Sequence, residues 1–376
     1  MKPISLDDIE MYLLFEKSDN KYLLGSKKKD RYVIVSEDNG KKYMKLLSDL
    51  NGENDYEDLA IKWNVPVSYV YRIVHDFCEK GLLVNSANQN DNTEINRLCK
   101  KLISIPCGKL QKMNEKKTNS IIGFFFCLLI ISLMFNICHI LQGDLSDIRL
   151  ISYKGSYILA LIVSSIIMIP SFFFHELCHA IAAIKYGLKP KRIDICLYLF
   201  LFPLYYVKIG GIYTVSKRKR MVIMSAGLVG NIFLASISLS LYILTTEVIF
   251  AILVLSQINI FIANINPFTL SDGYFIASHL FKVENIRTKV FDIITNFNLK
   301  KYLKDKKVIL YLFINVIYVG INITYISRYA YSILKVDLNF QIDYNLIIFF
   351  EILMIIIYFI IVRSRYRKGM KISEQS

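Results

Sequence analysis

The stretch YILALIVSSIIMIPSFFFHELCHAIAAIKY occupies residues 157–186 and decides the kind of fold that this chain can adopt. It is long enough to cross a bilayer core of about 30 Å as a single helix, which takes roughly 20 apolar residues. Its apolar run is interrupted only by His175, Glu176, His179 and Lys185. Ionisable side chains within a membrane span are costly and usually functional. The stretch therefore predicts a membrane helix that carries a functional site.

Residues 175–179 of this span read His-Glu-Leu-Cys-His. Residues four apart share one face of a helix, so His175 and His179 can bind one Zn²⁺ while Glu176 lies beside the reacting water. Zinc acidifies that water and polarises a substrate carbonyl, and Glu176 can take the proton and deliver it to the leaving amine. The alternative is a buried polar cluster that only joins helices. We interpret the motif as a catalytic zinc centre, in which the two histidines are ligands and Glu176 is the catalytic acid and base.

The composition of the whole chain supports a membrane protein. Of the 376 residues, 54% are apolar and 20% are charged, whereas soluble domains have about 45–50% and about 25%. The shorter apolar run 193–207 contains Pro203 and predicts a re-entrant hairpin. The expected fold is an all-α polytopic membrane protein with six transmembrane helices and this hairpin, preceded by a small N-terminal α+β winged-helix-like domain. Besides 157–186, the predicted spans are 120–141, 221–244, 248–267, 308–327 and 346–362.

The positive charges indicate how the chain crosses the membrane. The net charge is +15, and 28 Lys and Arg fall in the connections on one side of the predicted spans, against four in the loops 142–156 and 328–344. Cytoplasmic connections carry such an excess. We therefore expect a multi-pass protein of the cell membrane with both termini in the cytoplasm, and the basic excess does not indicate nucleic-acid binding. The seven cysteines have no spacing typical of a disulfide framework or a four-cysteine zinc site.

The residues before the first span have a different pattern. Apolar residues at helical spacing predict three helices around 43–50, 56–63 and 67–74, and short β-like runs lie at 22–24, 32–35 and 82–84. The expected organisation is a winged-helix-like domain (1–95), a basic linker (96–119), a transmembrane metalloprotease domain (120–363, with its core at 157–282) and a basic cytoplasmic tail (364–376).

A catalytic zinc site normally has three protein ligands, so a third is needed. His175 lies about 27 Å along its span, and Asp272 lies about 36 Å along the path that starts at Val248, which a break at Pro267 shortens. Both positions fall near the inner leaflet, and we therefore predict Asp272 as the third ligand. Its other interpretation is a cap on the helix after Ser271. The remaining candidates are at other depths, in other spans or interfacial: His139, Glu247, His279 and Glu351.

A membrane-embedded His-Glu-x-x-His followed by Asn-Pro-Phe-Thr-Leu-Ser-Asp-Gly at 266–273 resembles the site-2 protease family of intramembrane zinc metalloproteases. The resemblance covers roughly 157–282 and implies zinc bound by His175, His179 and Asp272. The family's Ala-Gly-Pro-x-x-Asn segment is matched at 226–231, with Leu228 in place of proline. This match implies that Asn231 orients the substrate, whereas hydrogen bonding between helices is its alternative role. The resemblance also implies that the hairpin in 193–215 offers an edge to extended substrate, whereas an ordinary interfacial loop is the alternative.

Residues 1–95 resemble the PqqD-like domains that recognise leader peptides in systems that process ribosomally made peptides. The resemblance implies a leader peptide as partner. A structural appendage and a DNA-binding domain are the alternatives, but the free side of the third helix has charges that cancel (Arg72, His75, Asp76, Glu79 and Lys80), so no nucleic-acid partner is expected.

The sequence thus predicts an intramembrane zinc endopeptidase that cleaves a membrane-associated peptide or protein, for instance a bacteriocin or modified-peptide precursor. Its rivals are a non-proteolytic transporter or immunity protein, and a membrane-anchored DNA-binding regulator.

Overall fold

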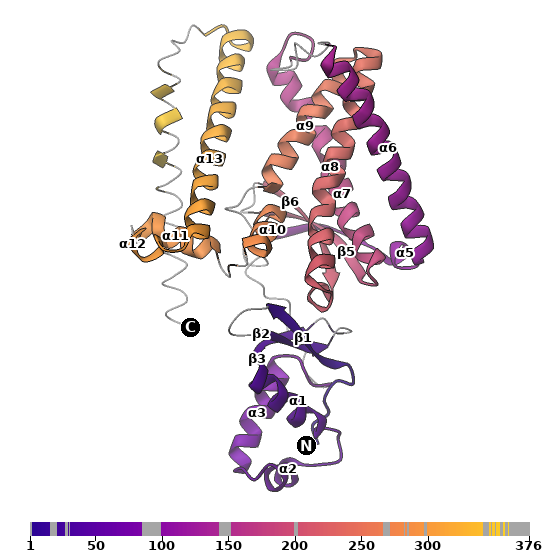
Figure 1. The fold of residues 1–376 in the computed structure, drawn as a ribbon, viewed down its shortest axis with the longest axis vertical. Coiled ribbons are helices and arrows are strands. Elements are labelled where there is room, and N and C mark those ends of the chain that lie inside the picture. The colour runs from indigo at the N-terminus through magenta and orange to yellow at the C-terminus, as the bar shows by residue number, and fades with distance from the viewer. Residues whose placement is uncertain are drawn as a thin grey trace. The chain divides into compact units, whose positions relative to one another are not determined.

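The structure is a computed structural model, and its helices greatly outnumber its strands (Figure 1). The chain divides into two compact units, one formed by residues 1–118 and 180–220 and the other by 119–179 and 221–376. Each is described by itself. The described residues are 2–15, 21–26, 29, 31–84, 99–142, 152–198, 202–265, 271–281, 283, 286–296, 299–340, 346, 348, 349, 351–353, 356, 357 and 360.

The first unit begins with a three-stranded antiparallel sheet in the order β1-β2-β3, formed by β1 (Ile9–Phe15), β2 (Lys21–Ser26) and β3 (Arg31–Ser36). Three helices follow, α1 (Glu37–Ser48), α2 (Tyr56–Trp63) and α3 (Val67–Glu79). The Ser36 side chain caps α1, and Asp55 with Asp58 forms a capping box at the start of α2. These caps satisfy N–H groups that a helix start leaves unpaired.

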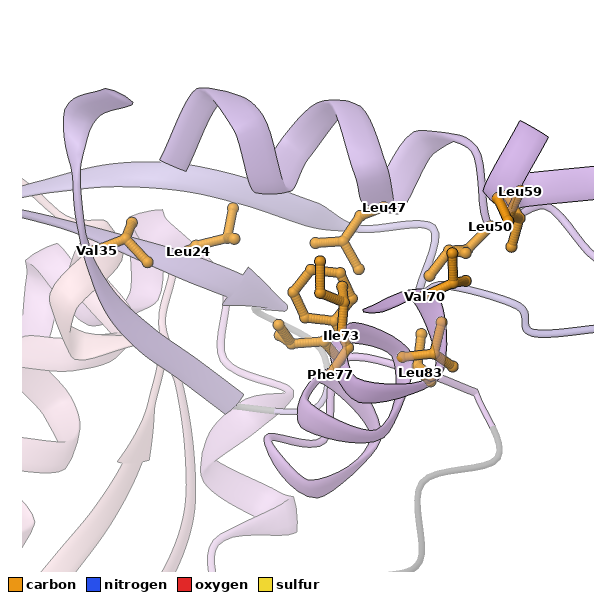
Figure 2. Packing of buried hydrophobic residues seen from close by; sticks show 12 residues of the cluster. Leu24, Val35, Leu47, Leu50, Leu59, Val70, Ile73, Phe77 and Leu83 are labelled. Atoms are coloured by element: carbon orange, nitrogen blue, oxygen red, sulfur yellow. The ribbon is translucent and has the colours of Figure 1, made fainter. Parts of the chain in front are cut away.

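The three helices and the sheet share one apolar core, part of which Figure 2 shows. Leu47 from α1, Leu59 from α2 and Phe77 from α3 are each at most 2% exposed. The three predicted helices and the strands at 22–24 and 32–35 are confirmed. Two predictions differ from the structure. Residues 82–84 form no strand but only an isolated bridge from Leu83 to Ser5, and β1 is an additional strand.

A second three-stranded sheet has the order β4-β5-β6 and is antiparallel throughout. β5 (Lys189–Tyr198) and β6 (Phe202–Gly210) form the hairpin expected around 193–207. β4 (Cys99–Pro106) pairs with β5 and comes from the segment expected to be a linker. The buried carboxylate of Asp194 on β5 fixes this pairing, since it accepts from Ser104 at 2.6 Å and lies 3.0 Å from Lys101 Nζ. The short helix α5 (Gly108–Gln111) follows β4.

The second unit contains long apolar helices that run side by side (Figure 1). Five helices of the described residues are long and apolar enough to cross a membrane: α6 (Glu115–Leu141), α7 (Tyr157–Lys185), α8 (Lys217–Thr245), α9 (Val248–Ile265) and α13 (Lys306–Ser332), the last continued by a π-helical turn at Ile333–Asp337. They coincide with five predicted spans. Of the sixth, 346–362, nine residues are described and all nine are helical, while the other eight lie outside the described residues. Between α9 and α13 lie α10 (Asp272–Phe281), α11 (Ile286–Asn296) and α12 (Leu299–Tyr302).

Polar side chains join the membrane helices at buried positions. Between α6 and α8, Ser132 and Ser236 are hydrogen-bonded at 2.7 Å, and Asn136 donates to the Ser236 carbonyl at 2.9 Å. Between α7 and α9, Gln257 donates to Ser171 at 2.6 Å. Such bonds contribute modestly in a membrane, about 0.6 kcal/mol on average. They connect α8 to α6 and α9 to α7, and α8 contacts the site described next.

Candidate metal centre

The sequence motif of α7 forms a buried cluster. His175, Glu176 and His179 are 2%, 9% and 5% exposed, and their ligand atoms all lie within 4.8 Å of one another. The Nε2 atoms of the two histidines are 3.2 Å apart. One helical turn separates the two residues, so the helix alone brings both imidazoles to one face.

Asp272, the first residue of α10, completes the cluster. Its Oδ2 lies 2.9 Å from His175 Nε2 and 3.1 Å from His179 Nε2. Ligands about 2.0–2.1 Å from a tetrahedral zinc are about 3.3 Å from each other. The three mutual distances therefore approach those of one face of such a site. The structure brings the predicted third ligand to the two predicted histidines.

Gly273 explains how Asp272 is held in place. A Cβ at this position would meet the backbone carbonyl group of Ile265, at the end of α9, at less than 3.0 Å. Glycine thus permits the start of α10 to lie directly against the end of α9. The contact is with backbone, which cannot move aside as a flexible side chain can. Residues 266–270, which carry most of the Asn-Pro motif, lie outside the described residues.

Gly227 on α8 borders the same cluster from the other side. A Cβ built on Gly227 would lie less than 3.0 Å from both His175 Nε2 and His179 Nε2. α8 can lie this close to the two imidazoles because Gly227 has no side chain. Two imidazole nitrogens and one carboxylate oxygen lie within 3.2 Å of one another, and this is a donor set suited to zinc. The structure contains no ion, and it identifies the residues that could hold one.

The remaining ring nitrogens of both histidines are engaged by α8. His179 Nδ1 donates to the carbonyl of Ile223 at 2.6 Å, and His175 Nδ1 lies 3.3 Å from Oδ1 of Asn231. A proton on Nδ1 leaves Nε2 with a free lone pair, which is the tautomer that a metal needs. Asn231 is 1% exposed, and its Nδ2 has no hydrogen-bond partner among the described residues. The side chain thus orients a predicted ligand and keeps one buried donor available.

Sequence reasoning missed two members of this site, Gly227 and the carbonyl of Ile223. Gly227 belongs to the matched segment 226–231 and to a small-residue pattern with Gly230, whose Cβ would collide with Cys178 of α7, but neither signal gave it a place at the metal. Small residues at such spacing permit close helix contact, but the pattern does not say what they face. The carbonyl of Ile223 has no sequence signal at all.

Of the other candidates for the third ligand, the described histidines lie elsewhere. His279 donates from Nδ1 to Phe275 of its own helix at 2.9 Å, and the ring of His139 lies 4.6 Å from that of Phe135 on α6. A further group of metal-binding residue types, His75, Asp76 and Glu79 on α3, is solvent-exposed. Exposed groups of this kind are common without a metal, and we assign no site to them.

Comparisons with known proteins identify no relative. The chain matches no protein-family model, no curated protein and no solved structure. The function must therefore be argued from the geometry of the site.

Proposed function

We propose that this protein is a membrane-embedded zinc endopeptidase. His175, His179 and Asp272 would hold the metal, and Glu176 would be the general base and acid. The observation that carries the proposal is the convergence of three ligand atoms, from α7 and α10, at mutual distances of 2.9–3.2 Å beside Gly227.

Each residue has a distinct part in this mechanism. When bound, zinc would supply the Lewis acidity that polarises a substrate carbonyl and acidifies water. Glu176 would accept a proton from the attacking water and donate it to the leaving amine. Asn231 would keep His175 in the ligand tautomer, and its unpaired Nδ2 is suited to donate to a substrate carbonyl oxygen. Burial of these groups strengthens their electrostatic interactions, because little water screens them.

The β4-β5-β6 sheet supports an extended peptide as the substrate. β4 covers one side of the β5–β6 hairpin, and β6 is the strand at the other edge of the sheet. Peptides bind to such edges by adding a strand, with affinity from main-chain hydrogen bonds. The substrate we propose is a membrane-associated peptide or protein, and the sequence resemblance of residues 1–95 to PqqD-like domains favours a peptide precursor with a leader segment.

The rival of DNA binding gains no support from α3. On the exposed side of this helix, His75 lies 3.7 Å from Glu79, and Lys80 lies 3.8 Å from Asp76. Opposite charges thus alternate where a DNA-reading helix would present a basic surface.

The decisive experiment replaces Glu176 with glutamine and measures both zinc and peptide cleavage. Glu176→Gln keeps the ligands, so zinc should stay near one per chain while cleavage falls by about 10²–10⁴-fold. Glu247→Gln, at the exposed turn between α8 and α9, is the matched control and should cleave normally. His175→Ala, His179→Ala and Asp272→Ala should each lose most of the zinc. Cleavage by Glu176→Gln at the wild-type rate would refute the proposal, and full zinc in Asp272→Ala would refute the third ligand.

A further inference from the structure

A cavity of about 90 Å³ lies among α7, α9 and α13. This volume is the space open to the centre of a water-sized sphere, of which one water molecule needs roughly 10–15 Å³. The cavity therefore has room for several water molecules. It lies within the predicted membrane span, because Ser164 is about 10 Å along α7 from Tyr157 and about 16 Å from His175. Its walls are formed by Ala160, Leu161, Ser164, Ile252, Leu255, Asn259, Tyr325 and Tyr329.

Half of these wall residues are polar, and two have unused hydrogen-bonding groups. Ser164 bonds to Ser256 at 2.8 Å, and Tyr329 donates to the carbonyl of Tyr157 at 3.0 Å. Within the described part of the chain, the Asn259 amide and the Tyr325 hydroxyl have no hydrogen-bond partner. A polar group left unpaired in a membrane interior is strongly unfavourable, because lipid offers it no hydrogen bond. A cavity that offers several polar groups and sufficient room is one that water fills.

Polar groups continue from this cavity towards the metal centre. Two turns beyond Ser164, Ser171 accepts from Gln257 Nε2, and Oε1 of the fully buried Gln257 has no partner among the described residues. Ser171 precedes His175 by one turn on the same helix face. The interface of α7 and α9 thus carries hydrogen-bonding side chains from the cavity to the first zinc ligand, and one of them has an unused acceptor.

We propose that the cavity among α7, α9 and α13 holds a cluster of water molecules within the membrane and that this cluster supplies the water for hydrolysis. The second half of this statement rests on the proposed function, because only a hydrolase consumes water. The first half does not, since it follows from the wall residues alone. An intramembrane hydrolase needs such a store because the surrounding lipid contains almost no water.

Thiol reactivity tests the presence of water directly. A cysteine reacts as its thiolate, and apolar surroundings suppress ionisation. Ser164→Cys and Asn259→Cys would be made in the full chain with its seven native cysteines replaced by alanine, placed in lipid nanodiscs and treated with methyl methanethiosulfonate. The matched controls are Ile166→Cys and Ile258→Cys, whose native side chains on the same helices are 63% and 42% exposed and would face lipid.

The cavity cysteines should react at least about tenfold faster than the lipid-facing ones, a difference equal to one pKa unit. Equal, slow reaction at all four positions would show that the cavity contains no water, and it would overturn the proposal. For the supply of water, Asn259→Leu keeps a side chain branched at Cγ and removes the amide. It should slow peptide cleavage several-fold with zinc unchanged, and an unaltered rate would overturn the supply role. Fast cavity labelling in a protein that cleaves nothing would refute the protease and leave the water cluster standing.

Discussion

Oδ1 of Asn231 on α8 lies 3.3 Å from Nδ1 of His175 on α7, and this contact relates a residue expected to orient substrate to a predicted zinc ligand. Partners that orient a ligating histidine typically change metal affinity by 10–100-fold when they are mutated. We therefore expect Asn231 to have two separable tasks, since its oxygen faces the histidine and its Nδ2 has no hydrogen-bond partner among the described residues.

Two substitutions at Asn231 should separate these tasks. Asn231→Leu removes the acceptor, so we predict zinc affinity about 10–100-fold lower, measured by competition with a chelator. Asn231→Asp keeps an acceptor for His175 and lacks the amide donor. It should retain zinc but cleave peptide more slowly. If Asn231→Asp cleaves as fast as the wild type, the amide nitrogen has no part in substrate binding.

Gly227→Ala should abolish zinc binding although alanine is not a ligand and suits a helix better than glycine. The new Cβ would occupy the space between the two imidazoles, so either a histidine must move or α8 must shift. Metal analysis of the purified protein is the measurement. Gly123→Ala on α6 is the control, because nothing lies within 4 Å of its Cβ, and it should bind zinc normally. Stoichiometric zinc in Gly227→Ala would contradict the position assigned to the metal.

The start of α7 and the π-helical turn that continues α13 meet in the structure, and we predict that both lie outside the cell. Asp337 accepts hydrogen bonds from the N–H groups of Tyr157 and Ile158, at 2.9 and 3.2 Å, so these ends share one side of the membrane. The excess of basic residues assigns the opposite side to the cytoplasm. In a background without native cysteines, Asn339→Cys should react with a membrane-impermeant thiol reagent on intact cells, and Ser216→Cys should not. Labelling of Ser216→Cys would mean that α8 crosses the membrane in the opposite direction, and this would contradict the predicted topology.

Acid should destabilise the N-terminal domain through Asp49. Burial alone would raise the pKa of Asp49, but hydrogen bonds from Lys62 and Trp63, at 2.7 and 2.8 Å, outweigh it and hold the pKa below its ordinary value. A carboxyl whose folded-state pKa is lowered stabilises the fold above its unfolded pKa of about 3.9, and this contribution is lost as the pH falls through the folded pKa.

The emission of Trp63, the single tryptophan of the chain, reports on this domain directly. The urea concentration at the midpoint of unfolding should decrease as the pH is lowered below about 5. Asp49→Asn is the control. It should be less stable at pH 7, and its midpoint should fall less on acidification, because the titrating group is gone. If the urea midpoints of the wild type and of Asp49→Asn decrease equally as the pH falls, the acid sensitivity comes from other carboxylates.

The sequence alone determined the parts of this protein that depend on local patterns. Apolar length predicted five helices that are long and apolar enough to cross a membrane, where a segment must satisfy its own backbone hydrogen bonds. Helical spacing placed His175 and His179 on one face, and the depths along two spans were enough to select Asp272. The three helices of the N-terminal domain followed from apolar periodicity, whereas β1, whose apolar residues do not alternate, was missed.

Only the tertiary structure decided which segments distant in sequence meet. The strand β4 lies in a segment whose basic composition is typical of a linker, and it becomes a strand because β5 offers it a partner and Asp194 accepts from its side chains. The contact of Gly227 with both imidazoles and that of Asn231 with His175 depend on how closely α8 approaches α7. Sequence spacing describes the face of one helix, and the distance between two helices is set by the packing of all the side chains between them.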